Sequence, residues 1–324
     1  MEMHDNSIKI FAKINFSLNI LGKLENGYHS LDTILVSVPE LYDIITITHR
    51  DDSSISIKTI PSDIFPISHI PQLELLNSNI KIHTAYKMAE ILRSKYNLGG
   101  MDIVVQKGIP MRGGLGGSAA AAAGVLELVN VLYDLNLDAS TKTALARNIG
   151  EDVPFMCTGG CARQIDADRS LNFFLPKVPI HHLIIISDSE GLSTKEVFEG
   201  FKSMGENGVL VDNTEFVKKL TTVDADYTTK ANNDIMFAKV SESLSHKDHD
   251  LYTLVSNSLV STASTLDSGI NASLNKLRAT GANVVSMTGT GSACFGIYEK
   301  NTRIDEIFKN LKDSCKYAYL CSIF

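Results

Sequence analysis

A run of glycines that leads directly into a run of alanines constrains this chain more than any other feature. Glycine occupies four of the five positions from 113 to 117, and alanine occupies all five positions from 119 to 123. Glycine lets the backbone adopt positive φ and approach a ligand closely, and a helix N-terminus carries about half a positive charge. The pattern therefore predicts an anion-binding loop at residues 110–118 and a helix at about residues 119–135.

This loop differs from two common phosphate-binding loops. The chain contains no G-x-x-x-x-G-K-[ST] run, which excludes a Walker-type loop, and no G-x-G-x-x-G follows the first strand of a βαβ unit. The second absence argues against a dinucleotide-binding domain of the Rossmann type. A plain turn into a helix remains the alternative, but the number of glycines favours anion binding.

Length and composition limit the class of protein. A chain of 324 residues is longer than most single hydrophobic cores, so we expect an N-terminal lobe at residues 1–170 and a C-terminal lobe at residues 171–324. The net charge of −7 argues against nucleic-acid binding, and no apolar run is long enough to span a membrane. The five cysteines are scattered, as is usual for reduced thiols in the cytoplasm. We therefore expect a cytoplasmic protein, either a monomer or a homodimer.

Hydrophobic periodicity predicts a mixture of strands and helices. Strands are expected at residues 8–20, 45–48, 53–58, 101–106, 183–186, 282–287 and 293–298. Helices are expected at residues 80–96, 119–135, 194–202, 216–219, 234–244, 271–280 and 304–313. Three prolines predict a loop at residues 61–71, and Ser140 is the expected N-cap of a helix that ends near Gly150.

Further motifs occur in order around the glycine loop. They are Ala-Lys-Ile-Asn at residues 12–15, Gly-Tyr-His at 27–29, Gly-Glu-Asp-Val-Pro-Phe at 150–155, Asn-Asp at 233–234 and Met-Thr-Gly-Thr-Gly-Ser at 287–292. The glycine loop resembles the P-x-x-x-G-L-x-S-S-x-A motif of the GHMP kinases. Gly-Tyr-His and Asp-Val-Pro-Phe resemble motifs of the group within this family that phosphorylates 4-diphosphocytidyl-2-C-methyl-D-erythritol. The matching stretches span residues 11–296.

The resemblance implies an α+β fold with two lobes. The N-terminal lobe would be similar to domain 2 of ribosomal protein S5, and the C-terminal lobe would be a ferredoxin-like α/β sandwich. The implied activity is transfer of the γ-phosphoryl of ATP, with Mg²⁺, to the 2-hydroxyl of this small-molecule alcohol in the non-mevalonate route to isoprenoid precursors. Two alternatives stay open: another GHMP kinase, of the mevalonate, phosphomevalonate or homoserine type, and a catalytically weak nucleotide-binding relative.

The resemblance also implies roles for individual residues. Asp152 would be the base or hydroxyl-orienting group, and Lys13 beside it would keep it ionised. Residues implied in nucleotide binding are Pro110, Arg112, Gly113, Gly114, Leu115, Gly116, Gly117, Ser118 and Ala119. Residues implied in binding the acceptor are Asn15, Tyr28, His29, Phe198, Gly289, Thr290 and Gly291. No Mg²⁺ ligands are identified.

The roles in acceptor binding differ in kind. Tyr28 would stack on the cytosine and His29 would hydrogen-bond to it. Phe198 would close the other face of the cytosine, although core packing explains an aromatic residue there equally well. The segment 289–291 would border the acceptor or the phosphates, or would serve only as a tight turn between two strands.

The chain departs from the family pattern inside the glycine loop. In an ungapped alignment, Ser118 stands at a glycine, and Ala119, Ala120 and Ala121 stand where two serines and an Asp or Asn are expected. In the general GHMP register, Ser118 instead matches the second serine. Arg112 is also unusual there and would add a positive charge. Backbone N–H groups, which need no particular side chain, would still bind the phosphates.

Overall fold

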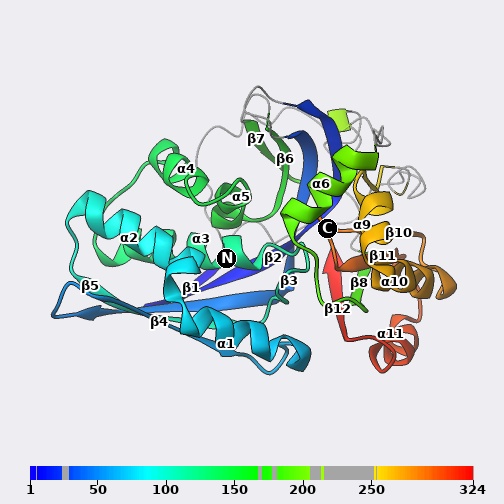
Figure 1. Cartoon of the computed structure of the whole chain (residues 1–324), viewed down its shortest axis with the longest axis horizontal. Coiled ribbons are helices and arrows are strands. Elements are labelled where there is room, and N and C mark those ends of the chain that lie inside the picture. Colours follow the sequence, from blue (N-terminus) through cyan, green and yellow to red (C-terminus); the bar gives the residue numbers. More distant parts are fainter. Residues whose placement is uncertain are drawn as a thin grey trace. The chain divides into compact units, whose positions relative to one another are not determined.

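The computed structural model of the protein describes residues 1–4, 6–23, 29–166, 170–176, 181–204, 213–214, 252 and 254–323 (Figure 1). The chain forms two compact units, each built from separate stretches. Unit 1 consists of Met1–Lys13, Pro39–Met111 and Leu115–Gly159, and unit 2 of Ile14–Val38, Arg112–Gly114 and Gly160–Phe324. The glycine loop therefore contributes residues to both units. The division into lobes at residue 170 stays a prediction.

The described residues of unit 1 form five strands or parts of strands. β1 (Glu2–His4) pairs antiparallel with β2 (Ser7–Lys23), and β3 (His29–Arg50) pairs antiparallel with β5 (Gly100–Lys107). β4 (Ile55–Pro61) pairs parallel with β5. Burial alternates along the end of β3, where Ile45 and Ile47 are buried, so one face of these strands packs into the core.

Helix α3 (Gly117–Leu132) confirms the helix expected after the glycine loop, and it packs against α2 (Thr84–Tyr96) (Figure 1). All of its residues from Ala120 to Val129 are buried. A Cβ at Gly124 would lie 2.7 Å from the side chain of Ile45, so the helix approaches β3 too closely for any larger residue. The small residue Gly124 therefore allows α3 to pack closely against β3 in unit 1.

Two local predictions in unit 1 are wrong. Helix α1 (Ile70–Ser78) begins inside the expected loop at residues 61–71, because Pro71 lies in its first turn, where a missing N–H costs nothing. Helix α4 (Ala139–Arg147) is capped by Asp138 and not by Ser140. The Asp138 carboxylate accepts the N–H of Thr141 at 2.7 Å, and the hydroxyl of Ser140 donates to the same carboxylate.

Unit 2 contains an antiparallel sheet in the order β10-β11-β8-β12. Its strands are β8 (His181–Ser187), β10 (Val284–Met287), β11 (Cys294–Tyr298) and β12 (Tyr317–Ile323). Its helices are α6 (Thr194–Met204), α9 (Val260–Leu266), α10 (Ser268–Ala279) and α11 (Ile304–Lys312). Helices follow the first and third strands, and the first and third strands lie at the centre. This is the ferredoxin-like arrangement that the resemblance implies.

The rest of unit 2 adds short strands to β2 and β3. β6 (Cys161–Ile165) pairs antiparallel with β3 and with β7 (Ser170–Phe174), and β9 (Ser256–Asn257) pairs parallel with β2. Helix α5 (Val153–Thr158) belongs to unit 1. The helices expected at 216–219 and 234–244 lie outside the described residues. No helix in the described part of the chain is long and apolar enough to cross a membrane.

Candidate active site

The glycine loop needs unusual backbone conformations. Gly114 and Gly116 have φ of +74° and +84°, and Arg112, at +55°, also lies in the left-handed region. Gly116 is the N-cap of α3, which begins at Gly117. Ser118 is therefore inside the first turn and does not cap the helix; its carbonyl accepts the Thr84 hydroxyl at 2.6 Å.

In unit 2, the carbonyls of the loop are bound by the segment 288–293. The carbonyl oxygens of Arg112 and Gly113 accept the N–H groups of Ser292 at 3.3 Å and Ala293 at 3.2 Å. The carbonyl of Gly114 accepts the Thr288 hydroxyl at 3.1 Å. In a trans peptide the C=O and the following N–H point in opposite directions, so the N–H groups after these carbonyls point away from this segment.

The same N–H groups are available for a ligand. Those of Gly113 and Gly114 form no hydrogen bond with any described residue. In unit 1, the first N–H groups of α3 are likewise without an intrahelical partner, as at every helix start. Open N–H groups at a helix N-terminus suit a phosphate, so the loop fits the polyphosphate of a nucleotide.

Lys13 and Asp152 form an ion pair in unit 1. Lys13 Nζ lies 3.3 Å from Asp152 Oδ2; the Lys13 side chain is 4% exposed and that of Asp152 is 40% exposed. The backbone N–H of Lys13 donates to the carbonyl of Leu115 at 3.0 Å. A Cβ at Gly116 would lie 3.0 Å from Lys13 Cγ, so the lysine stem runs along the start of α3. A buried cation and an accessible carboxylate thus lie beside the helix N-terminus.

Asp152 is presented by local structure. It directly precedes α5. Pro154 is tolerated in the first turn of that helix, because the backbone N–H groups there have no intrahelical partner to lose. The second carboxylate oxygen of Asp152 has no partner among the residues that the structure describes. That oxygen could accept a proton or a hydrogen bond from a hydroxyl group, or coordinate a cation.

The second glycine loop, at residues 287–292, is held by hydrogen bonds within unit 2. The Thr288 hydroxyl accepts the N–H of Asn15 at 2.9 Å. The side-chain amide of Asn257 donates to the carbonyls of Met287 and Gly289, both at 2.8 Å. Gly289 and Gly291 have positive φ, so the backbone here demands glycine. Sequence reasoning missed Asn257, whose partners lie about 30 residues away along the chain.

Three of the residues expected to bind the acceptor also have structural contacts. Asn15 is 3% exposed, and its side-chain amide donates to the Thr33 hydroxyl at 2.8 Å. The Thr290 hydroxyl lies 3.4 Å from that of Thr194, at the start of α6. Gly291 donates its N–H to the Thr288 carbonyl at 3.0 Å. Their predicted roles in acceptor binding stay predictions.

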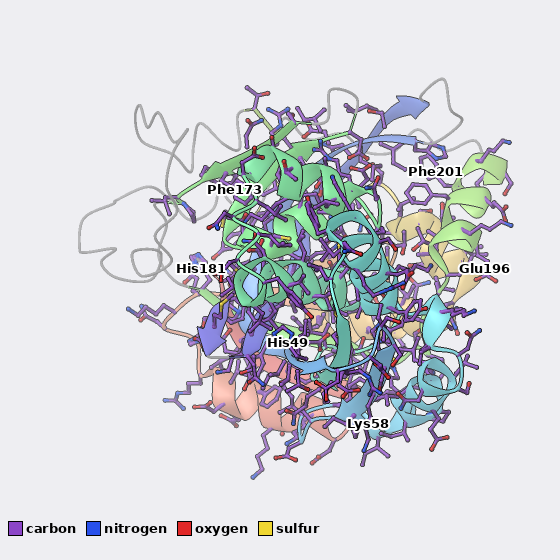
Figure 2. The ribbon with its side chains drawn as sticks, turned by 90° about the vertical axis from the view of Figure 1, so that its left-hand side faces the viewer. His49, Lys58, Phe173, His181, Glu196 and Phe201 are labelled. Atoms are coloured by element: carbon purple, nitrogen blue, oxygen red, sulfur yellow. The ribbon has the colours of Figure 1, made fainter. Side chains whose placement is uncertain are left out.

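His29 and Phe198 lie together in unit 2. Their rings stack with centroids 5.2 Å apart, and His29 also contacts the ring of Phe201 edge-on at 5.9 Å. Phe198 and Phe201 both lie on α6, where Figure 2 labels Phe201. Phe198 is partly buried against the core of unit 2, so it packs in the core and still stacks its ring on His29. Tyr28 lies outside the described residues.

The described residues contain no group of three His, Cys, Asp or Glu side chains that could hold a metal ion. Mg²⁺ in phosphoryl-transfer sites is usually bound by one or two carboxylates together with the phosphates and water. In unit 1, the accessible Asp152 carboxylate could coordinate such a cation, and the N–H groups at the start of α3 could bind a phosphate.

Comparison with known proteins identifies the family. The model of the GHMP kinase N-terminal domain matches residues 83–160, and that of the GHMP kinase C-terminal domain matches residues 253–316. A 4-diphosphocytidyl-2-C-methyl-D-erythritol kinase of Alkaliphilus metalliredigens is 30% identical over 322 residues, which cover 98% of this chain and 96% of the relative. The chain belongs to the GHMP kinase family.

Solved structures of GHMP kinases share the fold. A crystal structure of 4-(cytidine 5'-diphospho)-2C-methyl-D-erythritol kinase matches with a TM-score of 0.70 and 22% identity, over 98% of each chain. L. major mevalonate kinase, solved in complex with R-mevalonate, matches with a TM-score of 0.65 and 14% identity, over 99% of this chain and 96% of the other. These likenesses confirm the GHMP kinase fold. The N-terminal family match contains the glycine loop and Asp152, and the C-terminal match contains the second glycine loop.

Proposed function

We propose that this GHMP kinase transfers the γ-phosphoryl group of ATP to the 2-hydroxyl of 4-diphosphocytidyl-2-C-methyl-D-erythritol. The observation that carries the proposal is the Lys13–Asp152 ion pair beside the N-terminus of α3. The relative from A. metalliredigens, similar over nearly its whole length, bears the name of this activity. We further propose that ATP acts as its Mg²⁺ complex and that the reaction takes place in the cytoplasm.

The nucleotide half of the reaction rests on the glycine loop. The open N–H groups of Gly113, Gly114 and the first turn of α3 would bind the phosphates, with Ser118 and Ala119 among the residues of that turn. The exposed Arg112 would add positive charge at the loop. Because these contacts are mainly from the backbone, Ala119–Ala121 need not abolish nucleotide binding.

The chemical step would use Asp152 and Lys13. The acceptor hydroxyl oxygen attacks the γ-phosphorus, the bond from that phosphorus to the bridging oxygen breaks, and ADP leaves. Asp152 orients the hydroxyl group and takes its proton, and Lys13 places a positive charge 3.3 Å from the Asp152 carboxylate. His29, Phe198, Asn15 and the segment 289–291 would position the acceptor, together with Tyr28.

One observation favours a second candidate function. In the ungapped alignment, the polar side chains that the family motif has after the glycine loop are replaced by Ala119, Ala120 and Ala121. Their loss suits a nucleotide-binding relative with little catalysis. The ion pair of Lys13 and Asp152 favours the kinase, because a module that only binds nucleotide needs no accessible carboxylate there.

Turnover on a panel of acceptors tests the proposal. The purified protein is incubated with Mg-ATP and each of 4-diphosphocytidyl-2-C-methyl-D-erythritol, mevalonate, phosphomevalonate and homoserine, and ADP release is followed. We expect turnover only with the first. ATP binding without turnover on any acceptor would support the binding module, and turnover on mevalonate alone would move the protein to another branch of the family. An Asp152→Asn preparation controls for contaminating kinases.

A further inference from the structure

Unit 1 contains a buried ion pair that the proposed mechanism does not use. The Asp43 side chain, in β3, is 0% exposed, and that of Lys107, at the end of β5, is 5% exposed; Lys107 Nζ pairs with Asp43 Oδ2. Burying two charges costs several kcal/mol for each ion, so a pair of this kind is poor evidence for stabilisation. Its contacts with the neighbouring backbone suggest another role.

Asp43 binds the start of the glycine loop. Its Oδ1 accepts the N–H of Gly108 at 3.0 Å and the N–H of Ile109 at 2.9 Å. Burial raises the pKa of the Asp43 carboxyl group, and Lys107 and these two N–H donors oppose that rise. The two residues it holds come directly before the predicted phosphate-binding segment at 110–118.

Lys107 binds the end of the same loop. Its Nζ donates to the carbonyl of Gly117, the first residue of α3, at 3.2 Å. A Cβ at Gly117 would lie 2.9 Å from this nitrogen, so a side chain there would displace the ammonium group. Because C=O and N–H oppose each other in a trans peptide, holding the Gly117 carbonyl sets the direction of the Ser118 N–H.

We propose that Asp43 and Lys107 are positioning residues that hold both ends of the glycine loop and thereby orient its N–H groups toward the nucleotide phosphates. This inference rests on the proposed function, since it assigns the pair to the ATP side of that site. It predicts that the pair affects ATP affinity and leaves acceptor affinity nearly unchanged.

A second ion pair, with a buried carboxylate and a lysine that is 29% exposed, provides the matched control. Glu127 in α3 pairs with Lys142 in α4, with both carboxylate oxygens 3.0 Å from Lys142 Nζ. The Glu127 side chain is 5% exposed, so this carboxylate is buried much as Asp43 is. Glu127 and Lys142 both lie outside the glycine loop, so Glu127→Gln disturbs an ion pair with a buried carboxylate without touching that loop.

The test compares variants of the full chain by calorimetric titration with Mg-ATP and by the KM for each substrate. We expect Asp43→Asn to raise the Kd for Mg-ATP at least about tenfold, because a neutral amide accepts the two N–H groups more weakly than a carboxylate and leaves the charge of Lys107 unpaired. The KM for the acceptor should stay within about twofold. Glu127→Gln should lower the melting temperature while leaving the Kd for Mg-ATP unchanged.

If Asp43→Asn fails to fold, the double variant Asp43→Asn/Lys107→Met is used in its place, because it leaves no unpaired buried charge. It too should bind Mg-ATP weakly. A folded Asp43→Asn or double variant with wild-type ATP affinity would overturn the inference while leaving the proposed function standing. Glu127→Gln weakening ATP binding as much as Asp43→Asn would also overturn it. A wild-type protein that binds no Mg-ATP would overturn the inference and the proposed function together.

Discussion

The Asp152→Asn substitution tests the proposed chemistry most sharply, because it removes a charge and a proton acceptor while nearly preserving shape. Loss of a general base or orienting group typically lowers kcat by about 10²- to 10⁴-fold. That range corresponds to roughly 3–5 kcal/mol of transition-state stabilisation. We therefore expect kcat to fall at least about a hundredfold, with little change in the Kd for Mg-ATP.

The structure separates this effect from a loss of stability. Breaking a fully buried ion pair costs about 3–5 kcal/mol, and an exposed pair contributes about 0–1 kcal/mol. The Lys13 side chain is 4% exposed but that of Asp152 is 40% exposed, so we expect a loss of about 1–2 kcal/mol. Domains are commonly stable by about 5–15 kcal/mol, so nearly all of the variant stays folded. Unfolding therefore cannot explain a hundredfold fall in kcat, which corresponds to a rise of about 3 kcal/mol in the activation barrier.

The assay is steady-state kinetics with urea unfolding of the same preparations. Glu151→Gln is the matched control, since Glu151 is the adjacent carboxylate, is 51% exposed and lies 3.6 Å from Arg147 in a surface ion pair. Its kcat should equal that of the wild type. If Asp152→Asn retains kcat within about threefold of the wild type, Asp152 has no part in the chemical step.

Two further predictions concern stability. Burial and the charge of Lys107 lower the pKa of His83 from 6.5 to about 4. Between pH 6.5 and 4, His83 is therefore protonated in the unfolded chain but stays neutral in the folded protein. The free energy of unfolding should drop by up to about 3 kcal/mol over this range as the pH falls. His83→Asn, which can still cap α2, should reduce this drop in urea unfolding; an unchanged drop would remove His83 as its cause. Gly114→Ala should cost more stability than Gly281→Ala, because a Cβ at Gly114 would lie 2.2 Å from the Thr288 carbonyl oxygen, whereas at Gly281, also with positive φ, it meets nothing within 4 Å. We expect about 1 kcal/mol at Gly281 and clearly more at Gly114, and equal losses would contradict the close packing of the two loops.

Periodic segments and short motifs carried most of what could be predicted. The helix after the glycine loop, the helical stripe at 80–96 and the C-terminal order of helix, strand, loop, strand and helix agree with the elements observed. These signals are local, because a helix or strand exposes its buried face at a regular spacing. The motif at 12–15 and Asp152 lie far apart in the sequence, and only the resemblance linked them before their ion pair was observed.

The features that could not be predicted depend on contacts between distant residues. Asp43 and Lys107 are 64 positions apart in the sequence. Each is a single charged residue in or beside a segment with the pattern of a strand, so the sequence gives no sign that they pair. Asn257 reaches the second glycine loop from β9, a strand of two residues with no periodicity to detect. Each compact unit is built from three separate stretches of the chain, because β2 and β3 each contribute to both units. Sequence composition gives a single boundary along the chain and could not predict this division.

The alanines after the glycine loop lie within helix α3. Ala120–Ala123 are buried within α3, so the methyl groups pack in the interior of unit 1. We propose that the exposed charge of Arg112 offsets the missing polar groups. The Arg112 backbone is left-handed, which is typical of glycine, so the loop conformation is kept with a side chain present.

Identification of the reaction product tests the central claim most directly. The protein is incubated with Mg-ATP and 4-diphosphocytidyl-2-C-methyl-D-erythritol, and the product is analysed by mass spectrometry and phosphorus NMR. We predict one added phosphoryl group per acceptor, bonded as a monoester at the 2-hydroxyl, with one ADP formed for each product molecule. ADP formed without a phosphorylated acceptor, or an acceptor recovered unchanged under conditions where Mg-ATP is bound, would contradict the account.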